Sequence, residues 1–586
     1  MSVLHSLPCA LPTGALPADA AANADNISEA FASKLSTLSP DSLAKDAIWR
    51  DMFAVTGSLR TFYGAEACLA QWRHFHPKAA TGSFKYRSSS AKVVAVGPAA
   101  TWLECSYTFQ AEAKPKRDCL AIVSLVYDGE KGEWVVWMVR TVLDQLSGHP
   151  NVDHYMPDTT ANLPKEDQTQ TRFECVVIGG GQAGLSVAGR LAALGVSYVL
   201  LEKNKAVGDN WRHRYKSTKL HTTRESSHLP FDRTFPESYP EYLTKNDLAT
   251  GYSEWAKKFN INIWLDTSLQ SGGWLADSQS WQLDIVREGK NQQVMATHLV
   301  MAVGAGCQIP VMPQYPDKSR FRGTILHSGE YVSADAWQGK KGIVVGTANT
   351  AHDVAEDMLS AGLSSVTMVQ RSPTYVLPAE YYARMLNRIY TPTIPTLISD
   401  LGASTTPLGI ARLVNRTVLN GMAAQDPERF ERLAAAGFKV IRDGDIVYQL
   451  FEKFGGHYMD VGASGKIAAG FIKIKSDAGI ARYSEDGLVL EDDSKIEADV
   501  IIYATGFVGN MRNSVRDLFG DEVAGRVEDF WGIDAEGEIK GAFKPSGHPH
   551  LWLHGGTCGQ ARFFSRFIAM QIRAELDGTP LFNAQE

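Results

Sequence analysis

The chain carries ECVVIGGGQAGLSVAGRLAALG at residues 174–195, and this stretch decides the fold. Its first residues are largely β-branched and predict a short strand, whereas the residues from Gln182 onward predict a helix. Between them, Gly179, Gly181 and Gly184 follow the pattern G-x-G-x-x-G. Strand, glycine turn and helix in this order are typical of a parallel α/β fold that binds a dinucleotide.

Each glycine of this turn has its own expected role. Gly179 permits the tight turn, Gly181 lets backbone N–H groups approach a pyrophosphate, and Gly184 allows the helix to pack closely on the strand. Gln182 and Ala183 belong to the same expected cofactor-binding turn. A plain glycine turn without a ligand is the alternative when the motif is taken alone.

The next strand supports a nucleotide site at this turn. Residues 197–201 predict a strand that ends in Glu202, which is followed by Lys203. A carboxylate in this position accepts hydrogen bonds from both ribose hydroxyls and repels a 2′-phosphate. The site therefore fits FAD or NAD and does not fit NADP.

A second, degraded copy of the pattern begins at residue 341. Residues 341–345 predict a strand and residues 352–361 a helix, and alanine replaces two of the three glycines in the turn between them. Alanine leaves most of the room near a pyrophosphate, so a nucleotide site is retained. The turn residues expected to bind this cofactor are Gly346, Thr347, Ala348, Asn349 and Thr350.

The end of the following strand predicts which nucleotide binds there. Residues 365–369 are followed by Gln370, Arg371 and Ser372. A guanidinium in this place pairs bidentately with a 2′-phosphate, which favours NADPH over NADH. A surface arginine without a ligand is the alternative. Two nucleotide sites in one chain imply that hydride passes from NADPH at the second site to FAD at the first.

Composition limits the partners and the compartment. A net charge of −7 provides no basic patch for nucleic acid, and no apolar run reaches the roughly 18 residues of a membrane span. The seven cysteines lack C-x-x-C spacing, which argues against a dithiol flavin reductase and favours a reducing compartment. We expect a cytoplasmic protein that acts on a small molecule, and the sequence predicts no metal site.

The chain is too long for one core, so several domains are expected. In the first of them, an apolar pattern from Ala44 to Phe53 predicts an amphipathic helix, and strands follow it. The predicted organisation is a disordered leader at 1–40, a small helix-plus-sheet domain at 41–150, a linker at 151–171, the first part of an FAD-binding domain at 172–330, an NADPH-binding domain at 331–380, a helical insertion at 381–455, and the return of the FAD-binding domain with a C-terminal helix at 456–586.

Residues 321–331, FRGTILHSGEY, resemble the F-x-G-x-x-x-H-x-x-x-[YF] motif of flavin-containing monooxygenases. Related Baeyer–Villiger enzymes carry tryptophan where this chain has Tyr331, so the motif favours oxidation of a heteroatom. The resemblance covers about residues 172–575 and implies an α/β flavoprotein with two Rossmann-like dinucleotide-binding domains. The linker A-T-G-[FY] of the same superfamily is matched by Ala504, Thr505, Gly506 and Phe507, which are expected to contact cofactor.

Two runs are similar to the auxin-forming YUCCA-type branch of that family. Trp211, Tyr215 and His221 fall in a run like W-x-x-R-x-Y-x-x-L-x-L-H, although the arginine is displaced by one place. Residues 460–463, DVGA, match the D-[IV]-G-A run. Animal-type members that oxidise nitrogen keep an asparagine shortly after Trp211, and this chain has none there, so the substrate class stays open.

The resemblance implies a mechanism. NADPH reduces FAD, O2 adds at flavin C4a, and the C4a-hydroperoxyflavin transfers one oxygen atom to a small organic substrate. The oxygen goes to nitrogen or sulfur, or the substrate is a 2-oxo acid that is oxidatively decarboxylated. The alternatives are a Baeyer–Villiger insertion beside a ketone and a flavin-binding scaffold with little turnover.

The same resemblance assigns roles near the reacting centre. Trp211 is expected to pack at the flavin edge and also to contact the cofactor, with His221 and either Thr222 or Thr223 near the reacting face. His327 is expected to fix the relative orientation of the two nucleotide domains through a hydrogen bond.

A helix near the C-terminus completes the expected flavin site. Gly555 and Gly556 precede a predicted helix whose N-terminus stabilises negative charge on the reduced flavin ring. Arg562 and Arg566 on this helix are expected at the surface.

The first domain separately resembles the NTF2/SnoaL-like α+β cone, on residues 51–53 and 60–64. Such cones are catalytic in some proteins and serve dimerisation or binding in others. We therefore expect a homodimer through this domain. Asp51, His74 and His76 form a candidate acid/base set.

Overall fold

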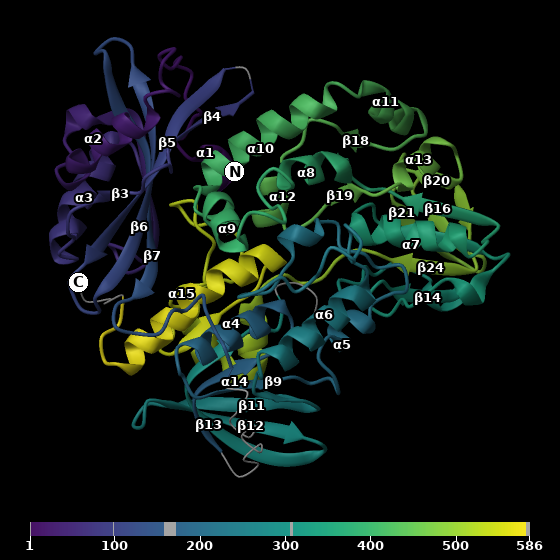
Figure 1. Cartoon of the computed structure of the whole chain (residues 1–586). Helices are drawn as coiled ribbons and strands as arrows, with labels where there is room; N and C mark the ends of the chain where they lie inside the picture. The colour runs from purple at the N-terminus through teal and green to yellow at the C-terminus, as the bar shows by residue number, and fades with distance from the viewer. Residues whose placement is uncertain (1, 98, 158–170, 305–308, 582–586) are drawn as a thin grey trace.

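The computed structural model describes residues 2–97, 99–157, 171–304 and 309–581. An N-terminal module of sheet and helix packs beside two α/β layers, and a group of helices fills the space between them (Figure 1). Residues 158–170 of the expected linker lie outside the described residues. No described helix is both long and apolar enough to cross a membrane.

The first glycine turn belongs to the largest α/β sheet. Its parallel part consists of the second half of β13 and the strands β8, β9, β10 and β25, and its antiparallel part of β11, β12 and the first half of β13. In spatial order the strands are β10 (Ile263–Trp264), β9 (Tyr198–Leu201), β8 (Arg172–Ile178), β13 (Lys290–Met301), β12 (Ser280–Arg287) and β11 (Thr267–Leu275), with β25 (Leu551–Leu553) also paired to β13.

Two helices cover this sheet around the glycine turn. The helix α4 (Gln182–Ala193) follows the turn directly, and α15 (Cys558–Leu576) lies against it although nearly 400 positions separate the two in sequence (Figure 1). Val177, Leu200 and Ile568 are fully buried in the apolar core that the sheet and helices share. The C-terminal helix is therefore an integral part of the first nucleotide domain.

The second glycine turn belongs to an all-parallel sheet of five strands. The helix α7 (Asn349–Ser360) covers it, and the chain returns late to place β24 between β14 and β15. In spatial order the strands are β14 (Thr324–His327), β24 (Val500–Tyr503), β15 (Lys341–Val345), β16 (Ser365–Val369) and β20 (Ile472–Lys475). A small antiparallel sheet is attached to this layer and consists of β21 (Ile480–Ser484), β22 (Gly487–Leu490) and β23 (Lys495–Glu497).

The segment expected to be a helical insertion is mostly helical. It also contributes to a small parallel sheet of β17 (Thr374–Pro378), β18 (Val440–Ile441) and β19 (His457–Asp460). Its helices are α8 (Ala379–Leu386), α9 (Thr396–Ser404), α10 (Leu408–Ala423), α11 (Pro427–Ala435) and α12 (Ile446–Phe451). They lie between the N-terminal module and the second nucleotide domain (Figure 1). Three other helices are α5 (Asp209–Arg212), α6 (Lys245–Lys258) and α13 (Ala463–Ala468), and α14 (Met511–Arg526) precedes the C-terminal return.

The N-terminal module is a seven-stranded sheet carrying the helix α3 (Ala65–Lys78). The expectation of a helix from Ala44 to Phe53 is wrong, because this segment is β1. The strand is nearly continuously buried in its second half, so its apolar residues do not alternate as a half-exposed strand would. The strands are β2 (Leu59–Tyr63), β1 (Leu43–Met52), β7 (Glu133–Leu146), β6 (Arg117–Asp128), β5 (Ala100–Ala111) and β3 (Lys85–Tyr86), with β4 (Lys92–Val96) on β5.

The expected disordered leader is ordered at both ends. The short helix α1 (Val3–Ser6) buries Leu4, and its backbone and Ser2 donate hydrogen bonds to Glu452 of the helical segment. The helix α2 (Ala24–Ser36) packs its apolar side on the N-terminal module. The proline-rich composition of this segment predicted disorder. The residues that stabilise it, such as Glu452, are distant in sequence, so the composition could not reveal them.

Candidate cofactor and substrate site

The first turn is shaped so that side chains are excluded at two of its glycines. Gly179 has a φ of +104°, and a Cβ there would lie 2.6 Å from the carbonyl oxygen of Ala302. A Cβ on Gly184 would lie 1.8 Å from the carbonyl oxygen of Gly179. The backbone thus has the close approach of helix and strand that a pyrophosphate cradle requires.

Glu202 lies directly beside this turn. It follows β9, is buried, and its Oε2 accepts a hydrogen bond of 2.7 Å from the backbone N–H of Gly180. Its Oε1 accepts from the backbone and side chain of Asn204 at 2.8 and 2.6 Å. The neighbouring Lys203 is exposed. The structure therefore brings this carboxylate to the turn.

The N-terminus of α15 lies against the same turn. Gln182 donates from Nε2 to the carbonyl oxygen of Gly556 at 3.3 Å. Thr557 and Gln560 form a capping box at the start of α15. Gly555 and Gly556 follow β25, whose parallel pairing with β13 places them at the same sheet edge as Gly179. The two segments that the sequence associated only by resemblance are thus in contact.

The second turn shows the same tight geometry at its first glycine. Gly346 has a φ of +120°, and a Cβ there would lie 2.5 Å from the carbonyl oxygen of Ala504. Thr347 exchanges a hydrogen bond of 2.7 Å with Thr374, and Asn349 accepts one of 2.7 Å from the backbone N–H of Met459. The alanine-containing turn is therefore held rigidly. Ala348 caps α7, and Thr350 is half-buried in its first turn.

The residues after β16 separate into one buried and two exposed side chains. Gln370 is buried, donating from Nε2 to the carbonyl oxygen of Lys439 at 2.9 Å and accepting from the backbone N–H of Lys439 at 2.7 Å. Arg371 and Ser372 are exposed. Their side chains are accessible to a ligand at the edge of the sheet.

His327 connects the two motifs that carried the resemblance. Its Nε2 lies 3.1 Å from the carbonyl oxygen of Gly506, and its Nδ1 accepts a hydrogen bond of 3.1 Å from the backbone N–H of Gly329. This pairing requires a neutral ring with the proton on Nε2. Burial lowers the pKa of His327, which favours that form. Phe507 packs edge-on against the ring at 4.9 Å.

Two tyrosines anchor neighbouring segments to α7. Tyr215 donates to Asp353 at 2.6 Å, and Tyr331 donates to Asp357 one helical turn later. His221 Nε2 lies 3.7 Å from the other oxygen of Asp353. Sequence reasoning missed the two aspartates, although their spacing of four puts both on one face of a helix.

The residues expected around the reacting centre do not share one surface. His221 lines an open cavity of about 1490 Å³ between α7, α11 and α13, whereas Thr222 lines a second cavity of about 230 Å³. Thr223 is buried, and its backbone oxygen accepts hydrogen bonds from two serine hydroxyls. Trp211 is half-buried, lines neither cavity, and has the guanidinium of Arg214 at 5.4 Å from its ring centre.

The second cavity is apolar and lies where three parts of the chain meet. The N-terminal module contributes Arg50 and Leu59, and the helical segment contributes most of the aromatic and aliphatic lining. The start of α15 closes it with Thr557 to Gln560. Its larger apolar side chains include Tyr382, Leu386, Tyr390, Leu408, Ile446, Leu450, Phe451, Trp531, Ile539 and Phe564.

A buried ion pair forms one wall of this cavity. Arg50 donates from Nε and Nη2 to the two oxygens of Glu538 at 2.6 and 2.7 Å, and both side chains are almost fully buried. Thr61 also donates to Glu538 at 2.6 Å. Sequence reasoning missed this pair because nothing local relates positions 488 apart.

The expectation that Arg562 and Arg566 lie at the surface is wrong. Arg562 donates to both oxygens of Asp400 at 2.7 and 2.6 Å, and Arg566 donates to Asp153 at 2.6 Å. Both are buried. Their carboxylate partners come from distant segments, which a helix pattern alone cannot show.

The candidate acid/base set of the N-terminal module is not assembled as expected. Asp51 accepts hydrogen bonds from the hydroxyls of Thr141 and Thr56 and from the backbone of Val55 and Thr56. In the described part of the chain, neither His74 nor His76 is among its hydrogen-bond partners. Asp51 therefore holds the turn that follows β1.

Comparison with known sequences identifies relatives of the α/β part. The family described as pyridine nucleotide-disulphide oxidoreductases matches residues 176–403. The probable indole-3-pyruvate monooxygenase YUCCA3 of Arabidopsis thaliana is 28% identical over 359 residues, which cover 59% of this chain and 76% of that protein. Indole-3-pyruvate monooxygenase YUCCA4 of Oryza sativa subsp. japonica is 29% identical over 362 residues, covering 57% and 74%.

Solved structures share the fold at low sequence identity. A cyclohexanone monooxygenase bound to ε-caprolactone superposes with a TM-score of 0.51 and 18% identity, over 70% of this chain and 88% of that chain. OTEMO in complex with FAD and NADP superposes with a TM-score of 0.50 and 15% identity, over 69% and 85%. These likenesses confirm the expected α/β fold with two dinucleotide-binding domains.

Proposed function

We propose that this chain is a flavin monooxygenase, an NADPH- and FAD-dependent enzyme that transfers one oxygen atom to a small organic substrate, because its α/β part is similar to the pyridine nucleotide-disulphide oxidoreductases and to the YUCCA-type monooxygenases. One observation carries the proposal. An apolar cavity is closed by the start of α15, and that start contacts the first nucleotide turn through Gln182 and Gly556. A substrate in the cavity would thus lie beside the flavin-binding end of the first domain.

The first turn fits the pyrophosphate of FAD, since Gly179 and Gly184 form a cradle that a Cβ would fill. Glu202 would bind the ribose, and the N–H groups at the start of α15 would favour negative charge on the isoalloxazine ring. When bound and reduced, FAD supplies the electrons that activate O2. The chain itself would orient the ring and exclude water from it.

The second turn fits the pyrophosphate of NADPH, because a Cβ on Gly346 would clash with the backbone, as it would at Gly179 and Gly184 in the first turn. Exposed Arg371 and Ser372 would bind the 2′-phosphate, which distinguishes NADPH from NADH. His327 would hold the segment that follows β24 against the end of β14 through its contact with Gly506, so we assign it positioning rather than proton transfer. Tyr215 and Tyr331 would anchor their own segments to α7 through hydrogen bonds to Asp353 and Asp357.

The cavity chemistry favours an uncharged, apolar substrate. Its lining is mainly apolar, and the guanidinium of Arg50 is already paired with both oxygens of Glu538. No other lysine or arginine lines this cavity among the described residues. A carboxylate would therefore find no free cation there, so we favour oxygenation of an amine nitrogen or a sulfide sulfur.

Two other reactions remain as alternatives. The relatives named indole-3-pyruvate monooxygenases favour oxidative decarboxylation of a 2-oxo acid. Oxygen insertion beside a ketone would be the Baeyer–Villiger alternative, against which Tyr331 argues, and a flavin-binding scaffold would show little turnover.

A substrate screen tests the proposal. The purified yellow protein would be supplied with NADPH and air, and NADPH loss would be compared with H2O2 formed, for amines, sulfides, 2-oxo acids and ketones. We expect an amine or sulfide to raise NADPH loss and to lower the H2O2 formed per NADPH. Conversion of only the ketones to esters would overturn heteroatom oxidation, and no NADPH loss with any compound would favour the scaffold.

The domain organisation, the oligomeric state and the cellular location are also part of the proposal. We propose the domain boundaries given above for 41–150, 172–330, 331–380, 381–455 and 456–586, except that β14, β20 and β24 belong to the sheet of the NADPH-binding domain. We also propose that the N-terminal domain is NTF2-like, forms part of the substrate pocket and mediates a homodimer. Free, scattered cysteines favour a reducing, cytoplasmic location.

A further inference from the structure

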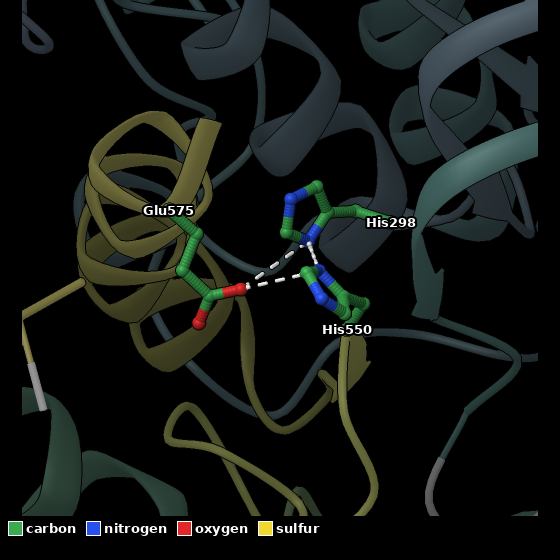
Figure 2. A group of neighbouring side chains, drawn as sticks. All are labelled: His298, His550 and Glu575. Carbon is green, nitrogen blue, oxygen red and sulfur yellow. Dashed lines mark hydrogen bonds and ion pairs between the residues drawn. The ribbon is translucent and has the colours of Figure 1, made fainter. Parts of the chain in front are cut away.

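Two histidines and one glutamate meet on the first nucleotide domain (Figure 2). His298 lies on β13, His550 immediately precedes β25, and Glu575 lies in the last turn of α15. His298 is three residues before the end of β13, so roughly 10 Å of strand separates it from the edge that carries the first turn. The cluster is therefore distinct from the cofactor and substrate sites.

The three donor atoms form a nearly regular triangle. His298 Nδ1 and His550 Nδ1 lie 3.4 Å apart, His550 Nδ1 lies 3.4 Å from Glu575 Oε2, and His298 Nδ1 lies 3.7 Å from the same oxygen. Bonds of roughly 2.0–2.1 Å to a tetrahedral zinc ion separate neighbouring ligands by about 3.3 Å. We propose that His298, His550 and Glu575 bind a divalent transition-metal ion of the zinc class.

The charge of the cluster supports this assignment. Two neutral imidazoles and one carboxylate are a donor set that zinc accepts. Within the described ranges, Glu575 forms ion pairs with these histidines and with no lysine or arginine. A divalent cation would compensate this partly buried carboxylate. Figure 2 shows all three side chains pointing toward a common centre.

The surroundings favour a structural rather than a catalytic ion. His298 is fully buried, and the indole of Trp274 stacks on His550 with ring centres 5.3 Å apart. The indole N–H of Trp552 approaches His298 Nδ1 at 3.4 Å, a long hydrogen bond that a metal would displace. The ion would tie the end of α15 to β13 and to the approach of β25, and so would hold the helix whose other end contacts the first turn.

Zinc binding by the full-length, FAD-containing protein tests the site. After dialysis against a chelator, titration with Zn²⁺ in a calorimeter should show one tight site per chain, and saturating Zn²⁺ should raise Tm because it binds the folded state. The variants His550→Ala and Glu575→Gln should each lower the affinity at least about tenfold and abolish the rise in Tm. Both side chains are partly exposed, so these variants are expected to fold.

A matched control uses another histidine–carboxylate pair at the same end of α15. His149 Nε2 lies 3.2 Å from Asp577 Oδ2, and among the described residues no third histidine, cysteine or carboxylate completes a metal-ligand cluster with them. His149→Ala should leave the affinity and the Tm shift unchanged. Failure of the wild type to bind Zn²⁺ stoichiometrically would overturn the proposal, as would equal binding by His550→Ala.

Discussion

Arg50 and Glu538 join the N-terminal module to the C-terminal return through a two-point ion pair, at 2.6 and 2.7 Å, and they line the proposed substrate cavity together. Breaking one side of a buried pair leaves the other charge uncompensated. The pair makes the module part of the site instead of a separate attachment.

Arg50→Ala should therefore destabilise the protein by about 3–5 kcal/mol, because Glu538 stays buried without its partner. It should also raise KM for the substrate. A matched control is Arg60→Ala, which breaks the half-exposed pair of Arg60 with Glu536 at the same junction and should cost less than about 1 kcal/mol. Urea denaturation of both variants gives the comparison, and equal losses would contradict the role assigned to Arg50.

Gly184→Ala should abolish FAD binding. The new Cβ would lie 1.8 Å from the carbonyl oxygen of Gly179, so helix and strand must separate and the cradle must open. The control Gly402→Ala places a Cβ on α9 with no atom within 4 Å and should retain FAD. The ratio of flavin to protein absorbance after purification measures both. Full FAD content in Gly184→Ala would show that FAD is bound elsewhere.

Arg371→Ala should raise KM for NADPH by about 10- to 100-fold, because a charge-assisted hydrogen bond to phosphate contributes about 1.5–3 kcal/mol. KM for NADH should not change. Replacement of the exposed Arg322, which pairs with Glu485, serves as a control for loss of surface charge. Steady-state kinetics with both nucleotides decide the matter, and equal use of NADH and NADPH by the wild type would refute the 2′-phosphate assignment.

Acid should destabilise the fold, because several buried histidines are neutral in the folded chain. Burial lowers the pKa of His228, His352 and His457 to about 4 and that of His554 to about 3, from 6.5. The unfolded chain binds these protons below pH 6.5 and the folded chain does not, so stability falls between pH 6.5 and about 4.

Each such histidine should contribute about 1.4 kcal/mol of lost stability per pH unit in that window. Urea midpoints at pH 7.5 and pH 5 test this. His352 packs on Tyr458, and its Nδ1 hydrogen-bonds the backbone oxygen of Ala348 in the second turn. His352→Gln removes one of these titrating groups, so the number of protons taken up on unfolding should fall by one. Urea midpoints that do not change with pH would contradict the claim that these histidines are buried and neutral.

The local part of the site was predictable from sequence. The turn from Gly179 to Gly184 and the position of Glu202 follow from short-range patterns, because one β-α-β unit contains them all. A hydrogen bond from His327 was expected between the two nucleotide domains, whereas its contact with Gly506 joins the ends of two neighbouring strands of one sheet.

The non-local part was not predictable. Arg562 on Asp400 and Arg50 on Glu538 pair residues that are 162 and 488 positions apart, and no periodicity encodes such partners. The strand β1 was mistaken for a helix because burial on both faces removes the alternation that distinguishes a strand. His298, His550 and Glu575 come from three separate elements and carry no metal-binding spacing.

The central claim is that the chain transfers one atom of O2 to a substrate in the apolar cavity. The most direct test supplies ¹⁸O2 and NADPH to the purified protein, together with the amine or sulfide that best stimulates NADPH loss. The mass of the product is then measured by mass spectrometry. The account predicts one ¹⁸O atom per product molecule. Product without ¹⁸O, or complete recovery of the NADPH electrons as H2O2 with every compound tested, would contradict it.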